Sequence, residues 1–205
     1  MHDVSIVATA SILPEIVVTN RDIGQRLIDG AHARNVRDAS AEETARQRAE
    51  VIEQKTGLRA RRFFGPEETP VDVGFALLEK MMDDSAWATL DAIIVSSSST
   101  QGFPGISQQI VAVARERHGA LAHPFVLDIS SNACTGFMYA LTVGKSLVQA
   151  MGYRRVACLA IEFSSRCIAY DPKAFGISTL FGDAAAGVLL EPGADGLATI
   201  KVTRA

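Results

Sequence analysis

The chain has 205 residues, of which 48% are hydrophobic and 21% are charged, so it can bury a core and is not a disordered protein. Its formal net charge is −3, with basic residues interspersed among acidic ones, which argues against binding to nucleic acid. The sequence has no long apolar run and no signal-peptide pattern. We therefore expect a cytoplasmic protein that is not inserted in a membrane.

Strand-like and helix-like segments alternate along the chain. The expected strands cover residues 4–13, 58–64, 90–98, 124–130, 154–162, 184–191 and 197–202. The expected helices cover residues 19–28, 40–57, 69–84, 105–119 and 134–149. Apolar strands separated by helices predict an α/β domain with a mostly parallel mixed sheet covered by helices on both faces.

Helix ends support these boundaries. Thr69 followed by Pro70 is typical of a helix start. Ser40 and Glu43 form a capping-box pattern before a charged segment that ends at Gly57. The Gly-Lys-Ser run at 144–146 falls inside an expected helix and lacks the earlier glycine of a phosphate loop, so it is a chance match.

The three cysteines are Cys134, Cys158 and Cys167. Their number is odd and no Cys-x-x-Cys pair occurs, so we expect free thiols with no disulfide and no zinc or other metal site. Cys158 lies on an expected buried strand and should be inert.

Cys134 stands where an apolar strand ends and a helix-like pattern begins. Unpaired N–H groups and the helix dipole stabilise a thiolate at such a junction. Thr135 and Gly136 keep the first turn slim, so that an acyl group could approach the sulfur. The alternative is a small buried cysteine that packs like alanine.

Several motifs resemble those of one known family and occur along the chain in the same order as in that family. The principal ones are ISSNACTGFMYAL around Cys134, DPKAFG at 171–176 and STLFGDAAAGVLLEP at 178–192. Further matches are ATASILPEIVVTN, EQKTGLRARRF and SSSSTQGFPGIS. Together they resemble the first half of β-ketoacyl-acyl carrier protein synthase III, of the thiolase-like superfamily.

The resemblance implies that residues 1–205 form an N-terminal thiolase-like half-domain. It implies an acyltransferase of fatty acid or polyketide-like metabolism in which Cys134 accepts an acyl group from a coenzyme A or acyl carrier protein thioester. A malonyl thioester then extends that group by decarboxylative condensation, with no cofactor. The backbone N–H of Cys134 is the expected contribution to the oxyanion hole.

The family's catalytic histidine and asparagine have no counterpart in this sequence. We expect its four histidines to be ordinary surface residues; they are His2, His32, His118 and His123. We expect the missing second half to belong to a longer form of the same chain, or else to a second polypeptide.

The residues expected to bind the acyl donor depart most from the family's pattern. The family's tryptophan and arginine that stack on adenine correspond here to Glu50 and Phe175, and an arginine before Thr-Gly corresponds to Lys55. This favours a longer acyl group or carrier-protein delivery. Arg59, Arg61 and Arg62 are candidates to meet phosphate or an acidic carrier protein, although for Arg61 we favour the alternative of a solvated strand edge.

Five other residues have weaker assignments. The resemblance implies that Phe103 reaches into the acyl tunnel of a partner subunit in a homodimer; the alternative is a loop anchor. Asp183 matches a turn near the family's site and is expected to be structural. Asn132 and Ser131 are expected to satisfy backbone groups, and Trp87 to pack in the core.

Two other functions stay open. A synthase III-like enzyme could transfer the acyl group to an oxygen or amine acceptor, or the chain could be a non-catalytic dimer partner or scaffold half.

Overall fold

The computed structural model describes residues 3–33, 39–99, 102–119, 123–130 and 132–201. The chain forms two compact units. Unit 1 comprises residues 1–12, 66–162 and 185–205, and unit 2 comprises residues 13–65 and 163–184.

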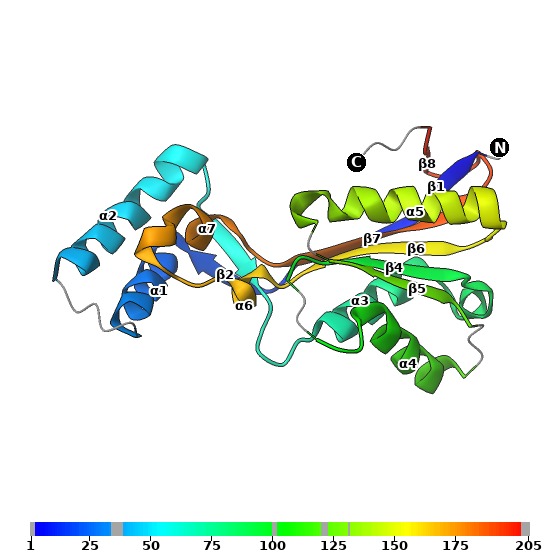
Figure 1. Cartoon of the computed structure of the whole chain (residues 1–205), viewed down its shortest axis with the longest axis horizontal. Coiled ribbons are helices and arrows are strands. Elements are labelled where there is room, and N and C mark those ends of the chain that lie inside the picture. Colours follow the sequence, from blue (N-terminus) through cyan, green and yellow to red (C-terminus); the bar gives the residue numbers. More distant parts are fainter. Residues whose placement is uncertain (1–2, 34–38, 100–101, 120–122, 131, 202–205) are drawn as a thin grey trace. The chain divides into compact units, whose positions relative to one another are not determined.

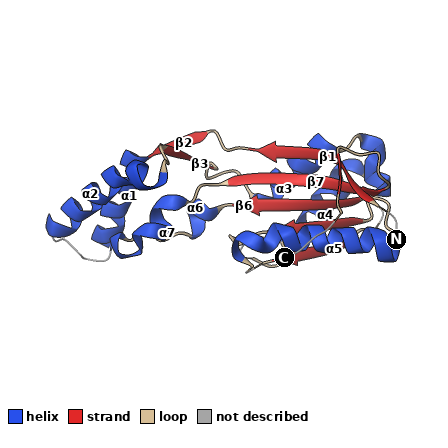
Figure 2. Ribbon diagram, turned by 90° about the horizontal axis from the view of Figure 1, so that it is seen from above, coloured by secondary structure: helices blue, strands red, loops and turns tan. Residues whose placement is uncertain are grey.

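Unit 1 is built on a mixed sheet, which in the described residues has six strands in the order β5-β4-β6-β7-β1-β8. The strands are β1 (Val4–Ile12), β4 (Ala92–Ser96), β5 (Phe125–Ile129), β6 (Val156–Glu162), β7 (Ala184–Pro192) and β8 (Ala198–Thr199). Strand β4 runs parallel to β5 and β6, and β1 runs antiparallel to β7 and β8. Figure 2 shows the arrowheads of β1 and β6 pointing the same way.

Helices cover both faces of this sheet (Figure 1). Helix α5 (Gly136–Met151) lies on one face, against β4 and β6. Helices α3 (Pro70–Met81) and α4 (Ile106–His118) lie on the other, and the short helix η1 (Asp84–Thr89) follows α3. The expected α/β fold with a covered mixed sheet is therefore confirmed.

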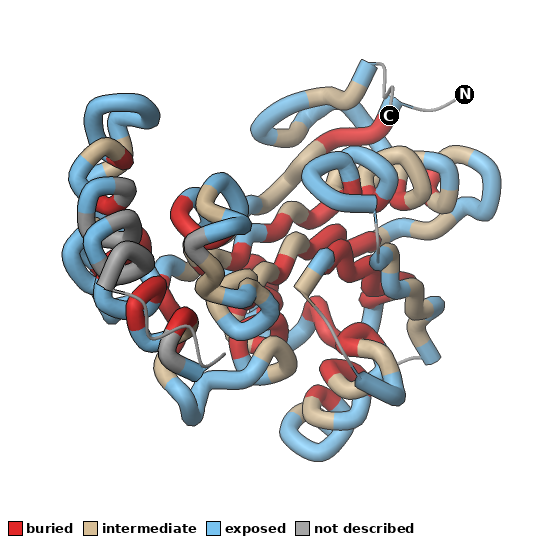
Figure 3. Tube along the Cα trace, turned by 60° about the vertical axis from the view of Figure 1, so that its left-hand side comes forward, coloured by how far each residue is buried: buried red, intermediate tan, exposed pale blue. Residues whose placement is uncertain are grey.

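The core of unit 1 follows from this two-sided cover. Every residue of β4 is buried, and β6 is almost as deeply buried; Figure 3 colours the buried residues of the chain red. Ile94 and Cys158 pack with α5, whereas Ile161 lies close to Gly74 of α3 and Ile110 of α4. Strands buried on both faces are continuously apolar, as β4 and β6 are up to their last residues, Ser96 and Glu162.

In its described residues, unit 2 combines a two-stranded antiparallel ribbon with two longer helices and three short ones. Strand β2 (Ile16–Thr19) pairs with β3 (Ala60–Phe63). The longer helices are α1 (Asn20–Ala33) and α2 (Ala39–Thr56), and the short ones are α6 (Ser164–Cys167), η3 (Pro172–Ala174) and α7 (Phe175–Leu180). Val18, Leu27 and Ile52 are central to its core, against which Phe175 packs. Among the described residues of both units, no helix is long and apolar enough to cross a membrane.

The helix starts were predicted with mixed success. Thr69 caps α3 as expected, since its Oγ1 accepts a hydrogen bond from the backbone N–H of Asp72 at 3.1 Å. Helix α2 begins at Ala39, and the side chain of Ser40 lies outside the described residues. The start of α5 was placed wrongly at Cys134: the α-helix begins at Gly136, after a 3₁₀ turn η2 (Ala133–Thr135).

The expectation for His118 was also wrong. Its ring stacks on Trp87, with centroids 4.5 Å apart, and its Nδ1 lies 3.8 Å from Asp84. Its Nε2 is buried and has no hydrogen-bond partner among the described residues. Trp87 is a core residue, as predicted. His123 is exposed and bonds to Arg115, while His2 and the side chain of His32 lie outside the described residues.

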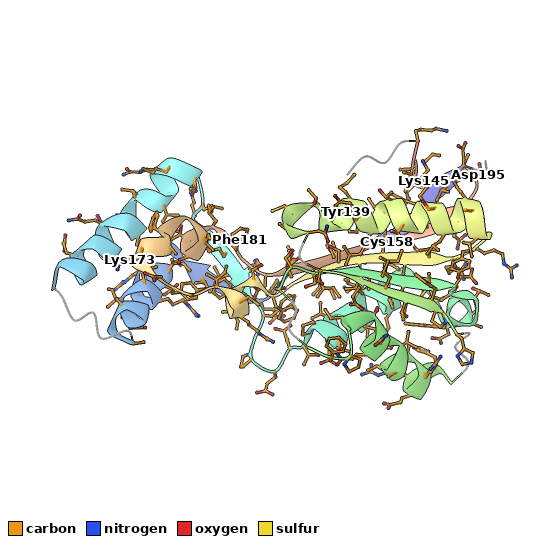
Figure 4. All side chains as sticks on the ribbon, in the orientation of Figure 1. Tyr139, Lys145, Cys158, Lys173, Phe181 and Asp195 are labelled. Atoms are coloured by element: carbon orange, nitrogen blue, oxygen red, sulfur yellow. The ribbon has the colours of Figure 1, made fainter. Side chains whose placement is uncertain are left out.

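A stripe of four residues brings α5 close to the sheet. Gly136, Ala140, Gly144 and Val148 recur every four residues and are the buried positions of the helix. A Cβ on Gly144 would lie 2.7 Å from the Cys158 Sγ and 3.0 Å from Leu190. Figure 4 labels Cys158 on β6. Its thiol donates to the backbone oxygen of Ala140 at 3.4 Å.

Gly144→Ala should therefore lower the free energy of unfolding. Overpacking of a tight interior costs about 1–3 kcal/mol, which outweighs the roughly 1 kcal/mol by which alanine favours a helix over glycine. Gly176→Ala in α7 is the matched control, because a Cβ there meets no atom within 4 Å. Urea unfolding followed by circular dichroism measures both. Equal stability of the two variants would contradict the tight contact.

Candidate active site

Three neighbouring parallel strands end at one edge of the sheet in unit 1. Strand β4 ends at Ser96, β5 at Ile129 and β6 at Glu162. Carboxyl ends of parallel strands meet at a common edge, which is where open α/β sheets bind their ligands. The segment that carries Cys134 follows β5 directly, so it lies at this edge.

The turn before α5 has an unusual backbone. Ala133 has a φ of 47°, the one non-glycine residue with positive φ in the described part of the chain. A left-handed conformation costs an L-residue roughly 1–2 kcal/mol, so surrounding contacts must hold it. Asn132 supplies two of these through its backbone oxygen, which accepts from the Thr135 N–H at 3.2 Å and hydroxyl at 2.8 Å.

The carbonyl oxygen of Ala133 is held as well. It accepts hydrogen bonds from the N–H of Gly136 and from the hydroxyl of Ser98, the latter at 3.2 Å. Cys134 follows in this turn and is exposed. The alternative of a buried, alanine-like Cys134 is therefore wrong: the turn holds the thiol at the surface, two residues before the helix begins.

Gly136 is required by the sheet beneath it. A Cβ at this position would lie 2.6 Å from the Ser96 Oγ, and Gly136 itself is buried. The sequence-based view that Gly136 keeps the turn slim thus has a specific steric cause, although the contact is to the sheet and not to a substrate.

Two residues of this edge were missed in the sequence. Ser98 links Ala133 to Glu162, because its backbone N–H donates to the Glu162 Oε1 at 2.8 Å. The Glu162 Oε2 is buried and has no hydrogen-bond partner among the described residues. The signal that could have indicated them was the polar residue at the end of β6 and the run of serines at and just beyond the end of β4.

The other two cysteines differ in exposure. Cys167, in α6 of unit 2, is exposed. Cys158 is fully buried, and burial raises the pKa of its thiol to about 12. A thiol that stays protonated at neutral pH is a poor nucleophile, so the prediction that Cys158 is inert is supported.

The candidate donor-binding residues all belong to unit 2. Lys55 lies exposed in the last turn of α2. Arg59 is exposed and pairs with Glu53 at 2.9 Å, and Arg62 is exposed and donates to the backbone oxygen of Pro14 at 2.9 Å. These cations lie at the surface, where they can meet an anionic ligand.

The expectation for Arg61 was wrong. Its side chain is buried and donates to the backbone oxygen of Thr179 and to the Asn20 side chain. Burial lowers the pKa of this guanidinium. The strand alternates between exposed and buried positions, so Arg61 points to the interior while Arg62 points to solvent.

The carboxylate of Asp183 accepts several hydrogen bonds within unit 2. It is buried, and its carboxylate accepts hydrogen bonds from the backbone N–H of Phe64 at 3.0 Å and of Ser165 at 2.8 Å. The hydroxyl of Ser165 donates to it at 2.6 Å. Asp183 thus ties the end of the β3 segment to the start of α6 within unit 2.

Phe103 and Glu50 occupy surface positions. Phe103 is 103% exposed in unit 1, which argues against the alternative of a loop anchor. Glu50 lines a cleft between α1 and α2 of unit 2, together with Asn20, Gly24 and Ala49. Ser131 lies outside the described residues.

Comparisons with known proteins agree with this architecture. The profile of the family described as 3-Oxoacyl-[acyl-carrier-protein (ACP)] synthase III matches residues 127–204. The β-ketoacyl-[acyl-carrier-protein] synthase III of Deinococcus deserti is 30% identical over 193 residues, which are 93% of this chain and 48% of that protein. The enzyme of the same name from Oenococcus oeni is 29% identical, over 93% of this chain and 52% of its own.

Solved structures show the same fold. The priming β-ketosynthase from the R1128 polyketide biosynthetic pathway has a TM-score of 0.71 and 25% identity, over 95% of this chain and 52% of that one. The 3-oxoacyl-[acyl-carrier-protein] synthase III of Aquifex aeolicus also has a TM-score of 0.71, at 23% identity, over 94% and 55%.

The fold and the cysteine-bearing turn thus define an α/β chain with part of the thiolase-like fold. The chain is related to the β-ketoacyl-acyl carrier protein synthases III, as its motifs indicated. It spans about half the length of the curated relatives it matches.

Native alkylation should distinguish the three thiols. With iodoacetamide at neutral pH we expect modification of Cys134 and Cys167, because both are exposed, and none of Cys158. Addition of denaturant should expose the third thiol. Peptide mass spectrometry reads each site. Rapid native alkylation of Cys158, or protection of Cys134, would contradict this placement of the thiols.

Proposed function

We propose that this chain carries the nucleophile of a decarboxylating condensing enzyme of the 3-oxoacyl-acyl carrier protein synthase III type. The observation that carries the proposal is the exposed Cys134 on a strained turn at the carboxyl edge of three parallel strands. Similarity to enzymes with that name over most of this chain supports it.

In the first step, the Cys134 thiolate attacks the carbonyl carbon of an acyl thioester. A carbon–sulfur bond forms at Cys134, and the donor's bond breaks to release coenzyme A or the carrier-protein thiol, which takes up a proton. Negative charge develops on the carbonyl oxygen, and a backbone N–H directed at it lowers the barrier. The N–H of Cys134 is our candidate for this donor.

In the second step, a malonyl thioester loses carbon dioxide, and the resulting enolate attacks the acyl group on Cys134. A carbon–carbon bond forms, the Cys134 thiolate leaves, and a 3-oxoacyl thioester is released. The enolate needs hydrogen-bond donors, which the resemblance assigns to a histidine and an asparagine. We propose that sequence beyond these 205 residues, in the same or a second polypeptide, supplies them.

We further propose an acyl donor that is longer than acetyl or is delivered by a carrier protein. Glu50 and Phe175 stand where the resemblance places an adenine-stacking tryptophan and arginine. Phe175 packs against the core of unit 2, and Glu50 would place a carboxylate, in place of an aromatic ring, where the resemblance puts the adenine. The exposed Lys55, Arg59 and Arg62 are the candidate contacts to an acidic carrier protein.

Acyl transfer is tested by intact-mass measurement on the natively purified protein with any chain that accompanies it. Incubation with short- and long-chain acyl thioesters of coenzyme A and carrier protein should add one acyl group. Cys134→Ala should abolish the adduct, whereas Cys167→Ser should retain it. An adduct that persists in Cys134→Ala, or no adduct on a complete assembly, would sink the proposal.

A fully exposed phenylalanine supports a dimeric enzyme, which we propose in line with the resemblance. If Phe103 closes the acyl tunnel of a partner subunit, Phe103→Ala should shift acylation toward longer chains by about tenfold, the lower end of what one methylene is worth in an apolar pocket. Met151→Ala is the matched control, since Met151 is a large exposed apolar residue of the same unit. Competition between a short and a long acyl thioester, read by intact mass, measures this. An unchanged preference for acyl chain length would contradict a role of Phe103 in the acyl tunnel.

A further inference from the structure

We propose that Ser98 and Glu162 are positioning residues that set the direction of the Cys134 backbone N–H. The inference rests on the proposed function, because it concerns the N–H that would stabilise the charged oxygen during acyl transfer. It names two residues outside the Cys134 segment, one after β4 and one at the end of β6.

The argument begins with the peptide bond between Ala133 and Cys134. The carbonyl of Ala133 and the N–H of Cys134 belong to the same planar group and point in opposite directions when that group is trans. The one cis peptide bond in the described residues lies elsewhere, at Phe103-Pro104. Whatever holds the Ala133 oxygen therefore also aims the Cys134 N–H.

The hydroxyl of Ser98 holds that oxygen, at 3.2 Å. The other hydrogen bond to the same oxygen comes from the N–H of Gly136, within the turn itself. Ser98 thus connects the peptide group between Ala133 and Cys134 to the segment that follows β4. A donor on the carbonyl also polarises the amide, which strengthens its N–H as a donor in turn.

Glu162 holds Ser98. Its Oε1 accepts the backbone N–H of Ser98 at 2.8 Å, so the end of β6 fixes the residue that follows β4. Residues beyond the end of a strand lack the backbone hydrogen bonds to neighbouring strands that would otherwise fix their position. A hydrogen bond to a carboxylate is about twice as strong as one between neutral groups. The chain of contacts therefore runs from Glu162 through Ser98 to Ala133 and the Cys134 N–H.

The conformation of Ala133 makes this support necessary. Its φ of 47° is unfavourable for alanine, so the turn would relax without contacts that hold it. Relaxation would rotate the peptide group and turn the Cys134 N–H away from the position of the developing charge. The thiol itself would stay exposed, since it lies at the surface of the turn.

The two roles of Cys134 can be separated by experiment. Cys134 would supply the thiolate that attacks and the backbone N–H that stabilises the oxyanion. Alkylation by iodoacetamide needs only the thiolate, because it forms no oxyanion, whereas acylation by a thioester needs the thiolate and the N–H. Ser98→Ala and Glu162→Ala should slow acylation of Cys134 by at least tenfold, toward the 100-fold cost of losing one oxyanion donor. Alkylation should change by less than about threefold if only the N–H has moved.

Conservative variants supply the control for a general loss of structure. Ser98→Thr keeps the hydroxyl and Glu162→Gln keeps an acceptor oxygen, so each should restore most of the acylation rate. Ser97→Ala is the matched control: Ser97 is a neighbouring serine whose hydroxyl pairs with Ser99. Equal losses in acylation and alkylation, or wild-type acylation in Ser98→Ala, would overturn the proposal.

A second measurement does not depend on acyl transfer. Labelling with ¹⁵N-cysteine gives three backbone amide resonances, because the chain has three cysteines, and Cys134→Ser assigns the relevant one. In Ser98→Ala and Glu162→Ala the Cys134 resonance should move while that of the buried Cys158 stays in place. An unmoved Cys134 resonance refutes the positioning role. A moved resonance in a protein that accepts no acyl group refutes the proposed function instead.

Discussion

The close approach of α5 to the sheet is the constraint on which the rest of unit 1 depends. Gly136, Ala140, Gly144 and Val148 form one stripe with a spacing of four residues, so they share one face of the helix. At both glycines the sheet lies where a side chain would begin, with Ser96 under one and Cys158 under the other. Small residues let the backbone sit directly on β4 and β6, and this fixes the point at which the helix starts.

The residue at which α5 starts determines where Cys134 lies. Because Gly136 is pinned over Ser96, only a short turn is left between the end of β5 and the helix. The chain makes this turn through a left-handed Ala133 and a 3₁₀ turn, which leaves Cys134 exposed. The parallel order of β5, β4 and β6 brings Ser98 and Glu162 to the same edge. The sheet topology and the helix stripe together build the site.

Much of this architecture could be predicted from the sequence, because burial on both faces of a parallel sheet leaves continuous apolar strands. The helix cap at Thr69 was also predictable, and so was the position of the Gly-Lys-Ser run at 144–146 inside a helix, since both depend on local sequence. Strand β2 was not, because three of its four residues are exposed and only Val18 is buried. Its identity comes from pairing with β3, which is a contact distant in sequence.

The site was predictable at Cys134 and not around it. A cysteine between a strand and a helix can be seen in the sequence, whereas a positive φ at alanine leaves no mark in residue type. Arg61 and His118 were misjudged for a related reason: polar residues are usually exposed. Here a strand alternation buries Arg61, and an aromatic neighbour covers His118.

The turn also bears on whether this chain is a catalyst or a scaffold half. A scaffold gains nothing from alanine in a left-handed conformation, since glycine would adopt the same φ without the steric cost. It gains nothing from an exposed thiol either, because a cysteine contributes to stability chiefly when it is buried, as Cys158 is. Strain that persists beside an accessible nucleophile is typical of active sites. The local cost therefore favours a catalytic role for Cys134, and the unusual backbone that precedes it is part of that case.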